Sequence, residues 1–343
     1  MLRLALPRRL FSSTMFVFGQ NANNTGHLAG SLDNHLIPTK LEFPSLSKAV
    51  IGFSESLLLS SESNLSSFGS SAVIAKNSFD LNDRALGKIK DADVDQNLAI
   101  YLKEGGEVLV EIFGELKSIG VNAETKFVAC GKSTTFTVTS GPKSDRVFRS
   151  KDDPTKLFAF DELNQMLQKS SNRIVKISAA DESLAMLLDN GRVLTWGNNN
   201  RGVIGKNRSL YFNEFQWENH PVDPLSEAQI DTKAKDFHLS SSVLVVLGEN
   251  GKAYYCGLDK TFLLTEIELP DGKRASGVGS WENNFSVVDE EGNVYFYKPL
   301  GHKNERLRFY GDEKLYKISK DYFEGRRVKS VRGKYTNAVA IAE

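Results

Sequence analysis

The residue types that most often do chemistry in proteins are few and scattered in this chain. Five histidines and two cysteines occur, at His27, His35, His220, His238, His302, Cys130 and Cys256. No His-x-x-x-His or Cys-x-x-Cys spacing groups them as ligands of a metal. The Gly-x-Ser-x-Gly turn of serine hydrolases and the Gly-x-x-x-x-Gly-Lys-Ser/Thr phosphate loop are also missing. We therefore predict no enzymatic activity, no metal and no cofactor.

The remaining chemical candidates have structural explanations. Cys130 and Cys256 each stand beside a glycine in an apolar segment, so we expect small buried hydrophobic residues and not reactive thiols. The acidic pair Asp93 and Asp95 is expected at a solvated turn. Trp196 is expected in a packed core and not at a ligand surface.

Short apolar segments bounded by turns run through the sequence, and they predict β-structure. The clearest unit covers residues 173–205, with strands expected at 184–188 and 193–196 around the turn Asp189-Asn190-Gly191. An Asn-Gly pair favours a hairpin, because both central positions of a type I′ turn need positive φ. A helical repeat would instead place apolar residues every three or four positions.

The same hairpin pattern recurs along the chain, at 244–256, 285–297, 97–112 and 127–148, and more loosely at 52–69. The turns are spaced by roughly 35 to 60 residues, which is the length of a propeller blade. Six complete copies therefore lie between residues 52 and 297.

A seventh copy, at 328–343, stops before its outer strand. The missing segment, aromatic-x-aromatic-Gly, occurs at residues 16–19 near the other end of the chain. A strand from each terminus in one blade would close the ring and remove its free edges. The sequence thus predicts an all-β fold, a single seven-bladed β-propeller covering residues 15–343.

These repeats resemble the regulator-of-chromosome-condensation family. Trp196-Gly197-Asn198-Asn199, with Gly202 and Gly205, matches the family signature W-G-x-N-x-x-G-x-x-G, and residues 18–30 resemble an imperfect copy. Ala129-Cys130-Gly131 followed by Ser133 resembles the family turn A-C-G-x-x-S, whereas residues 68–69 and 256–257 have Phe-Gly and Cys-Gly in place of Trp-Gly. The resemblance implies a propeller that binds protein partners, and its glycines concern fold and not function.

Two segments depart from the compact repeat. Residues 150–172 are charged and contain an expected short capped helix at 161–169. Residues 207–236 form an expected long loop with four candidate partner-binding aromatics, Tyr211, Phe212, Phe215 and Trp217. Long loops are often functional and exposed rings dominate protein interfaces, but these rings could equally cover a blade edge.

The charge is uneven although the chain carries 43 basic and 43 acidic residues. Residues 301–334 hold eleven Lys or Arg against five acids, with interleaved Phe and Tyr. That composition suits single-stranded RNA or an acidic partner, or else a solvated loop between the sixth and seventh blades. The candidate binding residues are Arg306, Arg308, Lys314, Lys317, Arg326 and Arg327.

Residues 1–14 contain three arginines, leucines and serines and no acid, which is typical of a mitochondrial transit peptide. We expect cleavage near Ser12 or Ser13 and a location in the mitochondrial matrix. A disordered basic N-terminus is the alternative, and a start at Met15 would give a cytosolic form. No apolar run of about 18 residues exists, so no integral membrane span is expected.

Three functions remain open. The first is a non-catalytic mitochondrial scaffold that supports the ribosome, ribosomal RNA or RNA metabolism, as the resemblance implies for members with a transit peptide. The second is guanine-nucleotide exchange on a small or dynamin-like GTPase, the founding activity of the family. The third is a cytosolic adaptor that starts at Met15.

Overall fold

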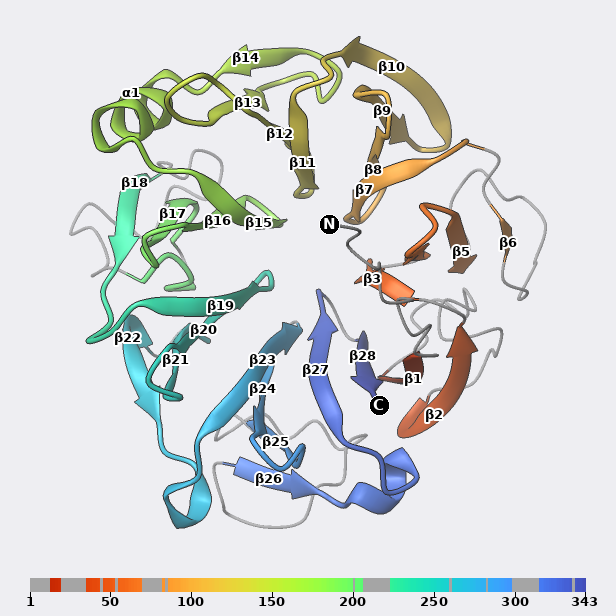
Figure 1. The fold of residues 1–343 in the computed structure, drawn as a ribbon, viewed down its shortest axis with the longest axis vertical. Coiled ribbons are helices and arrows are strands. Elements are labelled where there is room, and N and C mark those ends of the chain that lie inside the picture. The colour runs from red at the N-terminus through yellow and green to blue at the C-terminus, as the bar shows by residue number, and fades with distance from the viewer. Residues whose placement is uncertain are drawn as a thin grey trace, which may run out of the picture.

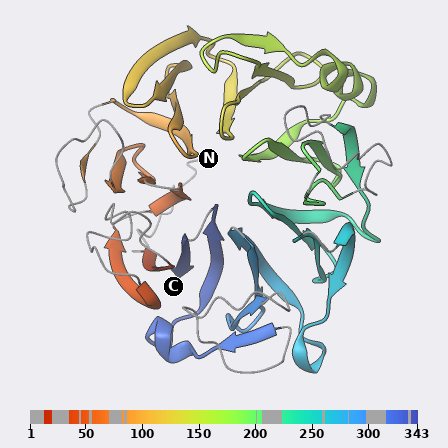
Figure 2. The ribbon, with the colours of Figure 1, turned by 180° about the vertical axis from the view of Figure 1, so that it is seen from behind.

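Seven four-stranded sheets surround one axis in the computed structural model (Figure 1, and from the opposite face Figure 2). The structure describes residues 13–19, 35–43, 46–52, 55–69, 82–83, 86–199, 201–205, 223–258, 261–281, 283–297, 315–334 and 337–343. Every pairing within a sheet is antiparallel. The predicted seven-bladed β-propeller is confirmed.

Six blades are built from consecutive strands, each running from an inner strand at the axis to an outer strand. The first holds β3 (Leu46–Ile51), β4 (Glu55–Ser60), β5 (Leu65–Gly69) and β6 (Asn82–Asp83). The second holds β7 (Ile89–Val94), β8 (Leu98–Lys103), β9 (Glu107–Ile112) and β10 (Glu115–Val121). The third holds β11 (Thr125–Cys130), β12 (Thr135–Thr139), β13 (Arg146–Ser150) and β14 (Leu157–Ala159).

The other three consecutive blades repeat this order. The fourth holds β15 (Ile174–Ala180), β16 (Ser183–Leu188), β17 (Val193–Gly197) and β18 (Asp223–Ala228). The fifth holds β19 (Ala234–Leu239), β20 (Val243–Gly248), β21 (Ala253–Gly257) and β22 (Thr261–Ile267). The sixth holds β23 (Ala275–Trp281), β24 (Asn284–Asp289), β25 (Val294–Tyr297) and β26 (Leu315–Ile318).

The closing blade combines both ends of the chain, in the order β27 (Val328–Gly333), β28 (Asn337–Ala342), β1 (Ser13–Gly19) and β2 (His35–Phe43). The N-terminus therefore supplies two strands, and the predicted outer strand at 16–19 is the third strand of the blade. β1 also begins two residues before Met15, since Ser13 pairs with Phe43 and Thr14 pairs with Ala342.

Two segments predicted as loops contain regular structure. The 207–236 segment includes β18 and the start of β19, and the 301–334 segment includes β26 and the 3-10 helix η3 (Lys320–Phe323), ahead of β27 in the predicted seventh copy. Alternating charged residues hid these strands, because the polar side chains either reach the ring axis or lie on an exposed outer strand. A second 3-10 helix, η2 (Pro270–Gly272), joins the fifth and sixth blades.

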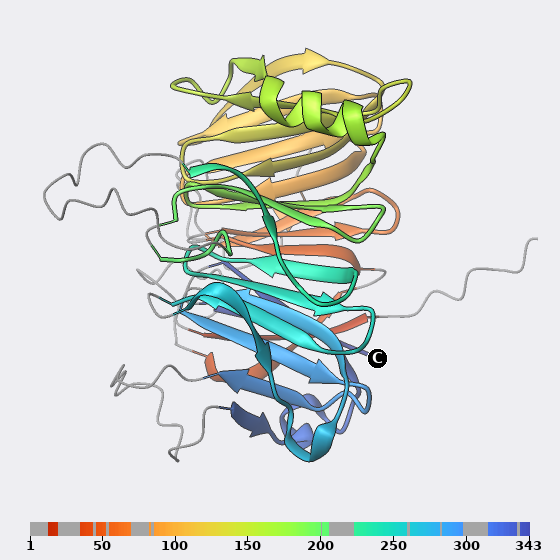
Figure 3. The ribbon, with the colours of Figure 1, turned by 90° about the vertical axis from the view of Figure 1, so that its left-hand side faces the viewer.

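The predicted helix is α1 (Asp161–Ser170), which lies on the rim between the third and fourth blades (Figure 3). It lacks the predicted cap, because Phe160 stands at the N-cap position and makes no side-chain capping hydrogen bond. Leu163 and Leu167 anchor the helix instead, since both are fully buried.

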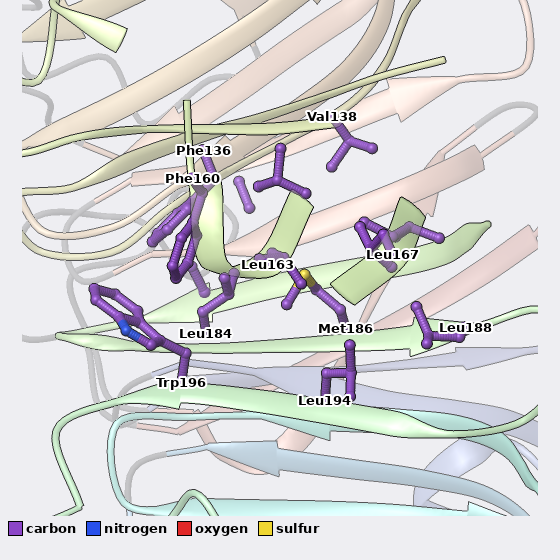
Figure 4. Packing of buried hydrophobic residues seen from close by; sticks show 14 residues of the cluster. Phe136, Val138, Phe160, Leu163, Leu167, Leu184, Met186, Leu188, Leu194 and Trp196 are labelled. Atoms are coloured by element: carbon purple, nitrogen blue, oxygen red, sulfur yellow. The ribbon is translucent and has the colours of Figure 1, made fainter. Parts of the chain in front are cut away.

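The core consists of apolar clusters between neighbouring blades. Figure 4 shows one such cluster, where Leu163 and Leu167 pack near Phe136, Met186 and Trp196. The Trp196 ring meets Phe160 edge-to-face at 5.3 Å between centroids, and the Arg149 guanidinium lies 4.5 Å from both ring centres. Trp196 is 9% exposed, which confirms the predicted core position.

The antiparallel blades give the ring two distinct faces. One face, called the loop face here, carries the connections between the first and second and between the third and fourth strands of each blade. The other, called the hairpin face, carries the turns between the second and third strands and the connections from blade to blade. Both described chain ends, Ser13 and Glu343, lie at the hairpin face.

Two signature glycines hold neighbouring segments of the loop face together. A Cβ atom on Gly131 would lie 2.1 Å from the carbonyl oxygen of Asp181 in the next blade. Gly197 has φ +123°, and a Cβ there would lie 2.2 Å from the carbonyl oxygen of Glu182. The glycines that resemble the family pattern thus permit close backbone approach, as the sequence predicts.

Candidate functional site

Charged side chains from the inner strands meet at the axis of the ring. Each inner strand has a register irregularity after its first residue, and several side chains at the third, fifth and seventh positions contact another inner strand. We call seven of them the axial cluster: Lys48, Asp91, Asp93, Lys176, Asp236, His238 and Lys334.

Lys334 crosses the axis from the closing blade to the second and third blades. Its Nζ lies 2.9 Å from Asp93 Oδ1 and donates to the carbonyl oxygens of Val94 at 2.9 Å and Cys130 at 3.1 Å. The side chain is only 6% exposed. Burial alone would lower the lysine pKa, but attraction to Asp93, Cys130 and Asp95 outweighs it and raises the pKa. Lys334 is therefore a buried cation that latches three blades.

Asp91 and Asp93 connect the second and third blades through β11. Asp91 Oδ2 accepts the backbone N–H of Val128, and Asp93 Oδ2 accepts that of Cys130, both at 3.0 Å. Asp91 Oδ1 also lies 2.6 Å from Lys48 Nζ of the first blade. The edge of an inner strand that faces the axis has no further strand to pair with, so these carboxylates satisfy backbone donors that would otherwise stay unpaired.

Lys176 and Asp236 make the equivalent contact between the fourth and fifth blades. Lys176 Nζ lies 2.6 Å from Asp236 Oδ1 and also donates to the carbonyl oxygen of Phe237 at 2.5 Å. Burial lowers the pKa of Lys176 to about 8, against the opposing attraction of Asp236, and the nearby cations Arg332 and Lys48 lower it further.

His238, two residues after Asp236 on β19, is held in its neutral form. Its Nδ1 accepts the backbone N–H of Ser280 at 3.3 Å and lies 2.9 Å from the Ser280 hydroxyl. Burial lowers the pKa of His238 well below its usual range, and the positive charges of Lys176, Arg332 and Lys334 add to the effect. Because Nδ1 accepts, Nε2 carries the hydrogen and is a donor.

The sequence analysis missed this site, and the expectation for Asp93 and Asp95 was wrong. Both are buried, with Asp95 at 0% exposure, because Lys334 lies 3.9 Å from Asp95 and compensates their charge from across the ring. Alternating acids in an apolar strand, Asp91-x-Asp93-x-Asp95, were a detectable signal. Lys334, the partner of Asp93 and Asp95, is 241 and 239 residues away along the chain, so only the closed ring reveals it.

The described basic candidates, Lys317 on the one hand and Arg326 and Arg327 on the other, lie at separate places on the ring. Arg306, Arg308 and Lys314 lie outside the described residues, but their segment joins strands β25 and β26 at the loop face. Arg326 and Arg327 follow β26 at the hairpin face, where Arg327 Nη2 donates to the carbonyl oxygen of Glu290 at 2.7 Å. Arg326 lies 3.7 Å from Glu324.

The remaining members of the basic segment have different environments. Lys317 is exposed in the middle of β26, whereas Lys334 belongs to the buried axial cluster. The predicted basic loop therefore contributes less surface charge than its composition suggests. The candidate aromatics Tyr211, Phe212, Phe215 and Trp217 lie outside the described residues, between strands β17 and β18 that end at the loop face.

Cys130 and Cys256 are both 0% exposed, so the prediction of buried hydrophobic cysteines is confirmed. Burial raises the pKa of each thiol, which keeps both protonated. Within the described ranges, no three His, Cys, Asp or Glu side chains could hold a metal ion together. No helix in the same ranges is long and apolar enough to cross a membrane.

Comparisons with known proteins define the class of fold. The chain is similar to a crystal structure of Prp20p from Saccharomyces cerevisiae, described with its binding to Gsp1p and histones, with TM-score 0.73, 14% identity and coverage of 96% of this chain and 91% of that one. Human WBSCR16 is similar with TM-score 0.72, 13% identity and coverage of 97% and 99%. Yeast RCC1 (Prp20) bound to Kap60 has TM-score 0.73, 13% identity and coverage of 96% and 89%.

At these identities the likeness shows the fold alone, a seven-bladed propeller that spans nearly the whole chain. No family model and no curated protein matches the sequence.

Proposed function

We propose that this chain is a regulator-of-chromosome-condensation type propeller that acts as a non-catalytic scaffold and binds a protein partner at its loop face. The likeness to Prp20p over 96% of the chain carries this proposal, since that protein is described by what it binds. The axial carboxylates support it, because they are occupied by backbone N–H groups and lysines between blades.

Topology favours the loop face as the docking surface. Four long connections, 20–34, 70–81, 198–222 and 298–314, join third and fourth strands and so link strand ends at this face. Loops on a rigid scaffold are the usual location of binding residues. The described chain ends, Ser13 and Glu343, lie at the opposite, hairpin face.

Phe113 is an exposed aromatic anchor on the loop face. It lies in the turn between β9 and β10, is 66% exposed, and has φ +45° followed by Gly114 at +89°. Asn-Gly is favoured in such a turn, and a bulky residue with positive φ is rare. Packing and backbone preference therefore do not explain this phenylalanine, whereas partner binding does.

Two exposed lysines of the third blade allow a matched test of the docking face. Lys132 lies at the loop face and Lys143 at the hairpin face. Proximity labelling by the full chain, with the label at the C-terminus, identifies the partner, and purified components then give its affinity. We expect Lys132→Glu to weaken binding and Lys143→Glu to leave it unchanged. Equal effects, or a larger effect of Lys143→Glu, would refute docking at the loop face.

Guanine-nucleotide exchange on a GTPase is the second candidate, supported by the likeness to Prp20p, which is described as binding Gsp1p. Exchange requires binding and displacement and no acid–base residue. A GTPase found by proximity labelling would be loaded with fluorescent nucleotide, and its release measured with and without this chain. Accelerated release supports exchange, and an unchanged rate with tight binding leaves the scaffold function.

We further propose that the scaffold works in the mitochondrial matrix near the ribosome or its RNA, and the transit-like residues 1–14 support this location. β1 begins at Ser13, so cleavage before Ser13 preserves the whole strand, whereas a cytosolic start at Met15 removes two paired residues. N-terminal sequencing of the protein from cells tests this. Ser12 or Ser13 supports import, and Met15 supports the cytosolic adaptor.

Direct RNA binding is a separate part of that proposal. It would involve the basic candidates Arg306, Arg308 and Lys314, with the exposed Lys317 of β26. Affinity for single-stranded RNA should then fall steeply between 50 and 200 mM salt, since phosphate contacts release counterions. A flat salt response would restrict the partner to protein.

A further inference from the structure

One cation at the ring axis has no partner among the described residues. Arg332 stands at the fifth position of β27, two residues before Lys334, and its side chain is partly buried. It forms no hydrogen bond and no ion pair with the described part of the chain. It shares the fifth position of an inner strand with Ser178 on β15 and His238 on β19, and its charge lowers the pKa of both Lys176 and His238.

The axial carboxylates already have other partners. Asp91 contacts Lys48 and the N–H of Val128, and Asp93 contacts Lys334 and the N–H of Cys130. Asp236 is paired with Lys176. Arg332 is therefore a positive charge that none of these three carboxylates neutralises through an ion pair.

Other hydrogen-bond donors at the third and fifth positions of β15 and β19 also lack a full set of acceptors. His238 Nε2–H is free, because Nδ1 is the atom that contacts Ser280. Lys176 Nζ uses two of its three hydrogens, on Asp236 and Phe237. Ser178, at the fifth position of β15 between Lys176 and Ala180, is partly exposed and has no partner among the described residues.

Side-chain exposure along the axis differs between the two faces. Toward the loop face the seventh positions are closed, with Asp95 and Ser240 at 0%, Ala180 at 1% and Trp281 at 7% exposure. Toward the hairpin face the third positions are open, with the side chains of Lys48, Lys176 and Asp236 at 32%, 27% and 34% exposure. The free donors are therefore more accessible from the hairpin face than from the loop face.

We propose that Arg332, His238, Lys176 and Ser178 form a binding site for a phosphate group at the ring axis. Two cations and two neutral donors stand at third and fifth positions of the inner strands β15, β19 and β27, and this combination suits the several acceptor oxygens of a tetrahedral dianion. A carboxylate would be satisfied by the guanidinium fork alone. The site is more accessible from the face opposite to the proposed protein-docking face, so this proposal stands or fails independently of the scaffold function.

Phosphate titration of the full chain tests the site, with calorimetry and thermal unfolding both followed at constant ionic strength. We expect saturable binding of inorganic phosphate to the wild-type protein. Arg332→Gln should weaken it at least about tenfold, because it removes a charge-assisted bond. Lys329→Gln is the matched control, since it removes one charge from the exposed side of the same strand and should leave binding unchanged.

Parallel titrations separate the sources of the anion. O-phosphoserine that competes with phosphate extends the site to phosphomonoesters, and exclusion of O-phosphoserine restricts it to the free ion. Acetate that binds as well as phosphate would overturn the assignment to a phosphate group. Ser178→Ala gives a second, smaller loss if Arg332→Gln fails to fold. No saturable binding to the wild type, or equal binding to every variant, would refute the site.

Discussion

At the residue scale, Lys334 is a lysine that is buried and holds blades together, although lysines usually lie at the surface. Its Nζ reaches a carboxylate and two carbonyl oxygens on other blades, and both acids near it are buried. Removing one partner of a buried pair leaves an uncompensated charge, at a cost of about 3–5 kcal/mol.

We therefore predict that Lys334→Met lowers the free energy of unfolding by roughly 3–5 kcal/mol in denaturant titrations. The double variant Lys334→Met/Asp93→Asn should recover part of the loss, because it also removes the stranded charge. Lys329→Met, an exposed neighbour on β27, serves as control. A loss as small as that of the control would show that the latch does not stabilise the ring.

His238 predicts a pH dependence of stability with a definite sign. Its pKa is depressed in the fold, chiefly by burial, so the unfolded chain binds a proton near pH 6.5 that the folded chain does not. The stabilising effect is thus present above pH 6.5 and is lost as pH falls below it. His238→Asn, which keeps an acceptor for Ser280, should flatten stability between pH 6.5 and 5. Identical slopes in variant and wild type would contradict this assignment.

We expect substitution of Phe113 to raise the stability of the fold and to lower the affinity for the partner. Phe113→Asn should raise the free energy of unfolding by about 1 kcal/mol, because asparagine tolerates positive φ. The same variant should weaken partner binding, because the exposed ring is lost. Thermal unfolding and the binding assay measure the two effects. A variant that is both less stable and fully able to bind would exclude an anchor role.

At the scale of elements, the hairpins were predictable and the chain closure was predictable in part. The Asn-Gly turn at Asn190 and Gly191 needs only local backbone geometry, so its two strands were located correctly. The inner strands carried acids and lysines that looked like surface residues, since their partners are on other blades. β2 was missed because its pairing with β1 follows a long connection.

Ring closure predicts a sharp dependence on the N-terminal boundary. β1 pairs with both β28 and β2, and Phe16 packs edge-to-face on Phe323 at 5.3 Å. A chain that begins at Ser13 should unfold at the same temperature as the full chain. A chain that begins at Met15 should unfold slightly lower, and one without residues 13–19 should lose cooperative unfolding. Full stability without β1 would contradict the closure.

At the scale of the whole molecule, the ring separates three kinds of surface. The loop face holds the connections between third and fourth strands, the hairpin face holds Ser13, Glu343 and the connections between blades, and the axis holds charges that join the blades. The sequence could predict the ring, because the repeat and the split seventh copy can be recognised from the order of residues alone. It could not predict the axial site, because no short segment contains both a cation and its acid.

The central claim is that this propeller binds its protein partner through the loop face. Cross-linking mass spectrometry of the purified complex, with an amine-reactive reagent, tests it most directly because exposed lysines mark both faces. Lys132, Lys151 and Lys156 lie on the loop face, and Lys143, Lys233 and Lys252 on the hairpin face. We predict cross-links to the partner from the first group. Cross-links confined to the second group would contradict the account.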